Sequence, residues 1–240
     1  MLLAGALGTI AGGTGTSYAE DKPEDATAWK TMARVGFTLT SGNSDTLLAT
    51  ASIQTQKKWD KNAISLGASG GYGENDGTKN SDYLNGYGQY DRSFSDRFYG
   101  YARVDAMHDA IADVEYRVTL SPGAGYYFVK SARFDLRGEV GPGVVFEKLG
   151  NDTHSYYTLR LGERLNWKIN DRSRLWQSVE YLPQVDDFSN YLVNAEAGVE
   201  TDITKKISLQ VFVQDSYRSE PAPSRKNNDV KLVSGIAYRF

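Results

Sequence analysis

Residues 132–147 read ARFDLRGEVGPGVVFE, and this stretch decides the fold class. Its even positions are apolar or small, while its odd positions up to residue 143 are charged or glycine. Successive side chains of a β-strand point to opposite faces, so the segment has one apolar and one charged face. The apolar set is Phe134, Leu136, Gly138, Val140, Pro142, Val144 and Phe146, and the opposite set is Arg133, Asp135, Arg137, Glu139, Gly141 and Gly143. Such a strand fits between lipid and a wet or salt-bridged interior.

The same period of two recurs along the chain from Trp29 onward. It is clear in residues 157–169, 191–203, 207–214 and 230–240, and looser in 35–39, 47–53, 64–68, 84–90, 98–104 and 118–128. Glu163 interrupts the apolar face of its segment. The pattern predicts an all-β fold: a single closed antiparallel transmembrane β-barrel of about twelve strands, an even number as in single-chain bacterial barrels.

The connections between these segments alternate in length. Short polar links fall at 60–62, 95–96, 130–131, 170–172 and 204–206, and longer ones at 74–80, 110–115, 148–154, 184–189 and 219–228, with 42–45 as a short exception. Outer-membrane barrels have short periplasmic turns and longer extracellular loops, so we expect both termini in the periplasm. Aromatic residues near predicted strand ends suit interfacial girdles, namely Trp59, Phe98, Phe128, Trp167 and Tyr217.

The beginning of the chain has a different character. Residues 1–10 are apolar, small residues follow, and the stretch ends in Ser17-Tyr18-Ala19 before two acidic residues. This resembles the apolar region and cleavage site of a secretory signal, although the positive amino-terminal region is missing. We predict a signal remnant over 1–19, a periplasmic linker over 20–28 and the barrel over 29–240, and hence a protein of the Gram-negative outer membrane.

Composition excludes several other classes. The 240 residues carry a formal net charge of −3, which gives no basic field to attract nucleic acid. The mean hydropathy is −0.49 and residues 20–240 have no long uncharged run, which excludes a bundle of transmembrane helices. A soluble β-sandwich or lipocalin-like barrel also alternates, but the many strands and the small residues among the polar positions favour the membrane barrel.

The inward face offers the candidate functional residues. Predicted lumen residues are Arg103, Arg117, Arg133, Arg137, Glu139, Arg160, Arg164, Glu180, Glu196 and Glu200, with Asp135 as a further acidic partner. Basic and acidic groups are partly segregated along the sequence, and in a wet lumen that would create a transverse field that sorts charged solutes. In a dry lumen the same groups must pair, because isolated buried charge is too costly. A narrow or gated pore for ions or small polar solutes and a plugged structural barrel therefore both remain open.

Two local features sharpen this prediction. A tight turn at Lys130-Ser131 would place Gly125 opposite Asp135 and Gly123 opposite Arg137, so that glycines make room for charged side chains. Pro122 and Pro142 lie inside neighbouring predicted strands, where proline removes a ladder hydrogen bond, so we expect a bulge there.

A surface hydrolase is the enzymatic alternative, and its candidate base is His108, near Asp105, Asp109 and Asp113. The other histidine, His154, lies beside Ser155, and adjacent strand residues point apart. No phosphate loop and no metal-spaced Cys/His set is present in the sequence. We therefore expect neither catalysis nor a cofactor or metal.

The first hairpin, residues 36–46, reads GFTLTSGNSDT and resembles the opening of the YdiY-like, salt-induced outer-membrane protein family. The resemblance extends over 29–240, and Gly42, Asn43 and Asp45 also suit the positive φ angles of a tight turn. It implies an outer-membrane barrel linked to envelope or salt stress, with no established catalytic residues. Proteins of this kind end in an aromatic residue read by the barrel-assembly machinery, and Tyr238 and Phe240 fit that signal. The expected partners are therefore outer-membrane lipid, the assembly machinery and small ions or solutes.

Overall fold

The computed structural model describes residues 28–40 and 46–240, and within these ranges the regular structure is entirely β-strand. The strands are β1 (Lys30–Thr40), β2 (Thr46–Trp59), β3 (Asn62–Asn75), β4 (Thr78–Ser93), β5 (Phe98–Asp109), β6 (Val114–Lys130), β7 (Phe134–Leu149), β8 (Asp152–Lys168), β9 (Ser173–Pro183), β10 (Tyr191–Asp202), β11 (Ile207–Arg218) and β12 (Asn228–Arg239). The predicted signal remnant, almost all of the linker and the 42–45 turn lie outside the described residues.

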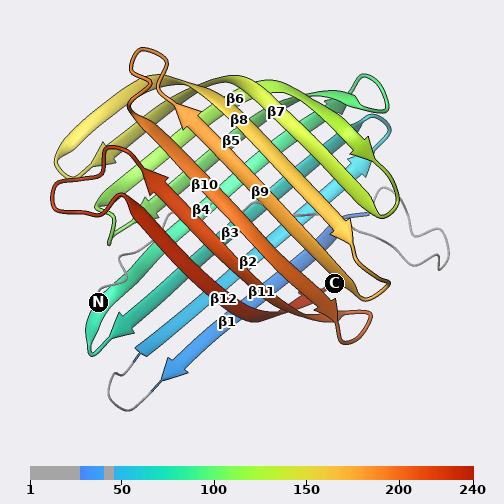
Figure 1. The fold of residues 1–240 in the computed structure, drawn as a ribbon, viewed down its shortest axis with the longest axis horizontal. Helices are drawn as coiled ribbons and strands as arrows, with labels where there is room; N and C mark the ends of the chain where they lie inside the picture. The colour runs from blue at the N-terminus through green and yellow to red at the C-terminus, as the bar shows by residue number, and fades with distance from the viewer. Residues whose placement is uncertain (1–27, 41–45) are drawn as a thin grey trace.

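The strands form one closed antiparallel barrel in chain order (Figure 1). Closure is made by β1 and β12, which pair from Met32 opposite Arg239 to Gly36 opposite Gly235. Every strand therefore has two neighbours, and no sheet edge is left to expose unpaired backbone groups. Among the residues that the structure describes, no helix has the length and apolar character needed to cross a membrane. The predicted fold class is confirmed.

One end of the barrel carries the turns 60–61, 94–97, 131–133, 169–172 and 203–206, and we call it the turn end. Most of these turns have, as their first or second residue, a short polar side chain that accepts a hydrogen bond from the backbone N–H three residues later, at 2.8–3.0 Å. The residues that do this are Ser95, Ser131, Asn170 and Thr204. Side-chain bonds of this kind favour turns over continued strand, which explains why the sequence marks these links so clearly.

The opposite end is the loop end, and its connections are less uniform than predicted. The segments 76–77 and 150–151 are two-residue turns, because β3, β4, β7 and β8 extend into the stretches expected to be loops. Asp76 and Gly77 both have positive φ, the pattern of a type I′ hairpin turn. Longer connections remain only at 110–113, 184–190 and 219–227 among the described residues.

The alternation predicted from the sequence is the alternation of the barrel wall. Apolar side chains on the outer face are exposed, for example Val35, Val140 and Leu232, while their strand neighbours face the lumen. Outward aromatic residues gather at the two ends: Trp59, Phe98, Phe128 and Trp167 at the turn end and Tyr116, Tyr157 and Tyr217 at the loop end. This is the arrangement of a lipid-facing band between aromatic girdles.

The predicted bulge at the two prolines is wrong. The register between β6 and β7 is the same before and after them, with Leu120 opposite Val144 and Ala124 opposite Val140. Both prolines face outward, and the strands approach so closely that a Cβ on Gly141 would lie 2.0 Å from the backbone oxygen of Pro122. The glycine lets the strands stay in register where the prolines remove ladder bonds.

The predicted pairing of Gly125 with Asp135 is also wrong. The turn spans 131–133, and β6 has a bulge between Tyr127 and Val129, so Gly125 lies opposite Glu139 instead. The space above the inward glycines of β6 is taken by tyrosines of β5. A Cβ on Gly125 would lie 2.1 Å from the ring of Tyr99, and one on Gly123 would lie 2.5 Å from the hydroxyl of Tyr101.

Candidate functional site

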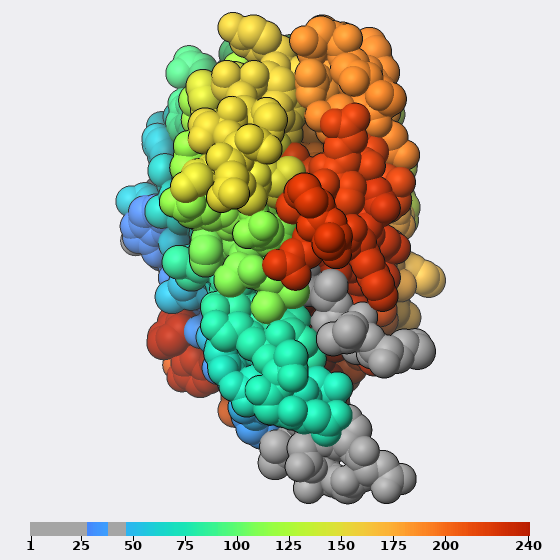
Figure 2. All heavy atoms as spheres, turned by 90° about the vertical axis from the view of Figure 1, so that its left-hand side faces the viewer, coloured from blue at the N-terminus to red at the C-terminus, as the bar shows by residue number. Residues whose placement is uncertain are grey.

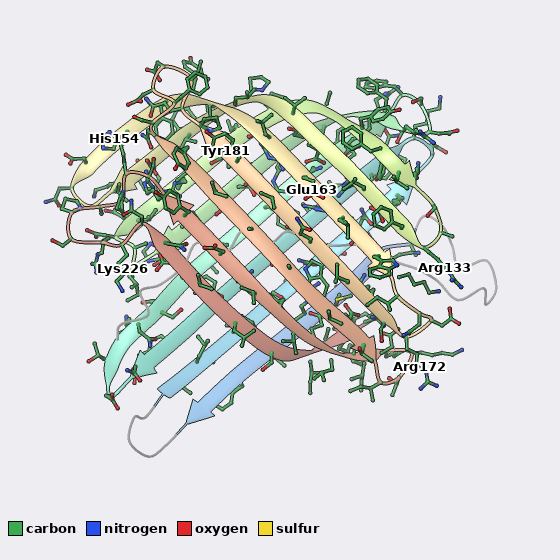
Figure 3. All side chains as sticks on the ribbon, in the orientation of Figure 1. Arg133, His154, Glu163, Arg172, Tyr181 and Lys226 are labelled. Carbon is green, nitrogen blue, oxygen red and sulfur yellow. The ribbon has the colours of Figure 1, made fainter. Side chains whose placement is uncertain are left out.

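The candidate site is the lumen, where the predicted charged residues meet. All of them except Arg133 occupy inward positions on β5 to β10, namely Arg103, Arg117, Arg137, Glu139, Arg160, Arg164, Glu180, Glu196 and Glu200. Arg133 is wrong as a lumen residue, because it lies in the 131–133 turn before β7 begins and is exposed at the turn end (Figure 3).

A central cluster is built around Arg160 of β8, whose side chain is 4% exposed. Its Nη1 donates to Glu139 of β7 at 2.8 Å, and its Nε donates to Glu180 of β9 at 2.6 Å. Its Nη1 also donates to the hydroxyl of Tyr101 at 3.0 Å. Tyr101 lies on β5, which is not a neighbour of β8 in the sheet. Charge-assisted hydrogen bonds of this length are strong, so Arg160 connects β5, β7 and β9 through the lumen.

Arg103 of β5 extends this cluster. Its guanidinium donates two hydrogen bonds to the carboxylate of Asp105, from Nε at 2.8 Å and from Nη2 at 2.5 Å. Its Nη1 donates to Gln89 of β4 at 3.0 Å. The amide of Gln89 donates onward to Glu139 at 3.3 Å. A continuous polar network thus crosses the lumen from β4 to β9.

Arg137 and Arg164 lie directly opposite each other on β7 and β8. Arg137 donates to the hydroxyl of Tyr127 at 3.1 Å. Together with Arg103 and Arg160, the pair lines a cavity of about 20 Å³ that Glu139 and Glu180 also line. Like charges directly opposite each other repel, so a carboxylate such as Glu139, or another anionic group, is favoured beside them.

Glu200 organises a second cluster nearer the turn end. Arg174 of β9 contacts it with Nε at 3.0 Å, Gln210 of β11 donates to it at 2.6 Å, and Arg239 of β12 also pairs with it. Arg239 bonds Asp202 at 2.7 Å as well. The carboxylate is almost completely buried and compensated from both sides.

Glu147 organises a third cluster at the loop end. Arg117 of β6 donates to it at 2.6 Å, and Tyr156 of β8 donates at 3.1 Å. Arg218 of β11 reaches the same carboxylate at 3.1 Å. Strands β7 and β11 are not neighbours, so the ion pair between Arg218 and Glu147 crosses the lumen.

The β11–β12 loop closes in over this cluster. The backbone oxygen of Glu220 accepts a bond from Arg218 at 2.6 Å, and Ala222 is 2% exposed. A cavity of about 20 Å³ has both this loop and Ile111 of the 110–113 segment in its wall, although they come from distant parts of the chain. Figure 2 looks onto the loop end and shows these segments packed against each other.

Oppositely charged side chains pair across the lumen, which is the arrangement expected for a dry lumen rather than the partial segregation that would give a wet lumen a transverse field. Glu139 lies among arginines, and Glu200 and Glu147 are each held by more than one of them. Glu147, Arg174, Arg218 and Arg239 are part of the site but were not predicted as lumen residues. Their inward parity was available in the sequence, but their partners on distant strands were not.

The histidine cluster considered for hydrolysis is not assembled. His108 faces outward and its Nδ1 lies 2.8 Å from the backbone oxygen of Glu115. Asp105 and Asp109 face inward on the same strand, so neither lies on the same side of the wall as the imidazole. Among the described residues, no group of three or more His, Asp or Glu side chains is placed to hold a metal ion.

With this geometry in hand, the comparisons with known proteins identify the family. The family model described as "Protein of unknown function, DUF481" matches residues 33–240. The chain belongs to the DUF481 family. The YdiY-like, salt-induced identity suggested by the first hairpin remains a prediction. None of the curated proteins matches the sequence.

Solved structures show the same fold in outer-membrane proteins. The NanC porin superposes with a TM-score of 0.56 at 10% identity, covering 87% of this chain and 100% of that one. The KdgM porin gives 0.49 at 8% identity with coverages of 89% and 99%, and the translocator domain of autotransporter NalP from Neisseria meningitidis gives 0.45 at 13% with 88% and 87%. The superposition on the NanC porin shows that the DUF481 chain has the fold of an outer-membrane porin barrel.

Proposed function

We propose that this DUF481 protein is a narrow pore for small ions or polar solutes in the bacterial outer membrane, held closed by paired side chains in the lumen. The observation that carries the proposal is the polar network from β4 to β9, in which charged and amide groups rather than apolar side chains cross the interior. A barrel filled only for stability gains nothing from so many buried ions, since apolar replacements of the same volume are often as stable.

The cavities limit what could pass. They measure about 20 Å³ beside Arg160 and about 50 Å³ beside Arg34 and Glu196. A single water molecule needs a cavity of about 10–15 Å³, so each cavity takes one or a few waters. Passage of any ion or solute through the central cluster requires its ion pairs to separate, and the two arginines that lie opposite each other on β7 and β8 favour anions.

The proposed orientation places the loop end outside the cell and the turn end in the periplasm, as in other outer-membrane barrels. The cross-lumen pair of Arg218 and Glu147 then lies at the outer mouth, beneath the 219–227 loop. Insertion through the barrel-assembly machinery and a role in salt stress, both implied by the family resemblance, belong to the same proposal. Loss of salt tolerance in a deletion strain, restored by the wild-type gene, is the expected result for the latter.

A non-conducting structural or adaptor barrel is the second candidate. It is favoured by the buried bridges that join distant strands, because such bridges brace the wall against deformation. Neither candidate involves catalysis.

Single-channel recording of the folded protein in planar bilayers separates the two candidates. We expect rare openings of small conductance from the wild type. Arg218→Gln removes the charge of the cross-lumen pair and should make openings more frequent. Arg172→Gln is the matched control, because this arginine is exposed in the 169–172 turn at the opposite end (Figure 3). No openings from wild type or Arg218→Gln, with insertion confirmed, would reject the pore and leave the structural barrel.

A further inference from the structure

The outer wall of the barrel carries an acidic side chain inside its apolar band. Glu163 of β8 lies on the outward face, because strand alternation places it on the same side as the exposed Leu161 and Trp167. Figure 3 shows it part-way along β8. The same strand bears Tyr157 towards the loop end and Trp167 towards the turn end, both outward and exposed.

The depth of Glu163 follows from strand geometry. A rise of about 3.3 Å per residue and a tilt of about 40° advance each residue by about 2.5 Å along the barrel axis. Along the barrel axis, Trp167 is then about 10 Å from Glu163 on one side and Tyr157 about 15 Å on the other. The two distances add to about 25 Å, the height of the apolar band that such barrels present to lipid. Glu163 therefore lies well inside the hydrocarbon layer.

Gln177 of β9 is its partner on the same face. The amide Nε2 of Gln177 donates to Oε2 of Glu163 at 3.2 Å, and both side chains are half-buried. This bond uses one of two amide hydrogens and a fraction of the carboxylate's acceptor capacity. Acyl chains offer nothing to satisfy the remainder, and an ionisable group in a membrane segment marks a functional contact by default.

Two positions across from the pair carry small residues. Gly138 lies opposite Glu163 on β7, where the ring of Phe128 covers the glycine, and the exposed Ala197 lies opposite Gln177 on β10. At Ala197 no long side chain keeps a second membrane surface away from the wall. The polar pair thus lies in a part of the wall that a second protein surface can reach.

We propose that this wall, defined by Glu163, Gln177, Gly138 and Ala197, is the contact between two copies of the chain in the membrane. In two copies inserted in the same direction, Glu163 and Gln177 lie at the same depth in the membrane. A two-fold axis along the membrane normal then brings the carboxylate of one copy to the amide of the other, and the reverse. A partner outside the membrane cannot reach this depth. The contact does not depend on whether the lumen conducts.

The chain has no cysteine, so a single introduced thiol reports one position without background. Leu161 lies on the proposed contact wall and Leu66 lies on β3, on a distant part of the barrel, and each is 40% exposed. With a thiol-specific bifunctional reagent applied to intact outer membranes, Leu161→Cys should give a cross-linked homodimer and Leu66→Cys should not. Equal yields from the two variants, or a product containing only a different protein, would overturn the proposal.

The polar pair is tested separately in detergent, where the dimer dissociation constant is measured by sedimentation. Glu163→Leu removes both symmetric bonds and should weaken the dimer at least tenfold, whereas Glu163→Gln keeps acceptor and donor groups and should stay within a few fold of wild type. Folding of each variant is checked by heat-dependent gel migration. A wild type that is monomeric at every concentration, or a folded Glu163→Leu variant that dimerises as tightly as wild type, would refute the contact.

Discussion

Replacing Arg160 with methionine tests how dry the centre of the lumen is. The guanidinium is 4% exposed and compensates Glu139 at 2.8 Å and Glu180 at 2.6 Å. Removing one member of a buried ion pair leaves the others uncompensated and costs about 3–5 kcal/mol. If water filled the lumen, the same change would cost about 0–1 kcal/mol, as for exposed ion pairs. The free energy of unfolding therefore distinguishes a packed interior from a solvated one.

The assay is urea unfolding of the barrel in lipid vesicles, followed by tryptophan fluorescence. Trp176 is a suitable reporter, because it is buried in the lumen on β9, next to the strand that carries Arg160. Lys79→Met is the control, since the pair of Lys79 with Asp82 is exposed at 46% and 36% and should lose at most about 1 kcal/mol. A loss for Arg160→Met no larger than that of the control would show that the central charges are solvated and that the reasoning is wrong.

Other predictions concern packing, pairing and assembly. Gly125→Ala places a methyl group against the ring of Tyr99 and should destabilise the barrel by more than about 2 kcal/mol in the same assay, whereas Gly86→Ala, with its nearest atom at 3.6 Å, should change it by less than about 1 kcal/mol. Glu200→Gln leaves two arginines with a neutral partner and should cost about 2–4 kcal/mol, and a loss below about 1 kcal/mol would count against the turn-end cluster. Phe240→Ser removes a side chain that is 74% exposed, so stability after folding in vitro should be unchanged while the amount assembled in outer membranes falls several-fold. Equal assembly of this variant and wild type would reject the proposed recognition of the last residue.

The strand count and the facing of most side chains were predictable, because both depend on one local rule. An apolar outer face and a polar inner face repeat every two residues, and the turn end is marked by short polar residues such as Ser131 and Asn170 that bond their own turns. Register was harder. The bulge between Tyr127 and Val129 changes the pairing of β6 with β7 by one residue, and no local pattern in the sequence predicts it. The register between β5 and β6 is likewise not encoded locally, and it places Tyr99 opposite Gly125, where the tyrosine ring occupies the space above the glycine.

The sequence predicts which residues face the lumen better than it predicts which of them contact one another. Alternation assigns Arg160 and Glu139 to the lumen, but it does not say that they meet, because their contact depends on how strands stagger around the barrel. The lumen position predicted for Arg133 is wrong because the alternation of β7 does not extend to this residue, which lies one position before the strand begins. Arg218 and Glu147 are separated by 71 positions in the sequence, and only closure of the barrel brings the two residues together.

In the proposed pore, the stability of the barrel and the opening of the lumen are coupled. Any solute that crosses the central cluster has to separate Arg160 from at least one carboxylate, at a cost of about 3–5 kcal/mol if nothing replaces the lost partner. Because each 1.4 kcal/mol is a factor of ten, the open fraction at rest is between about 1 in 100 and 1 in 4,000. An ion that takes the place of a lost partner lowers this cost, so the arginines opposite each other on β7 and β8 give a small anion a lower barrier than a cation of the same size. The proposed pore is therefore expected to open rarely and to prefer anions, because of the same bonds that stabilise the closed barrel.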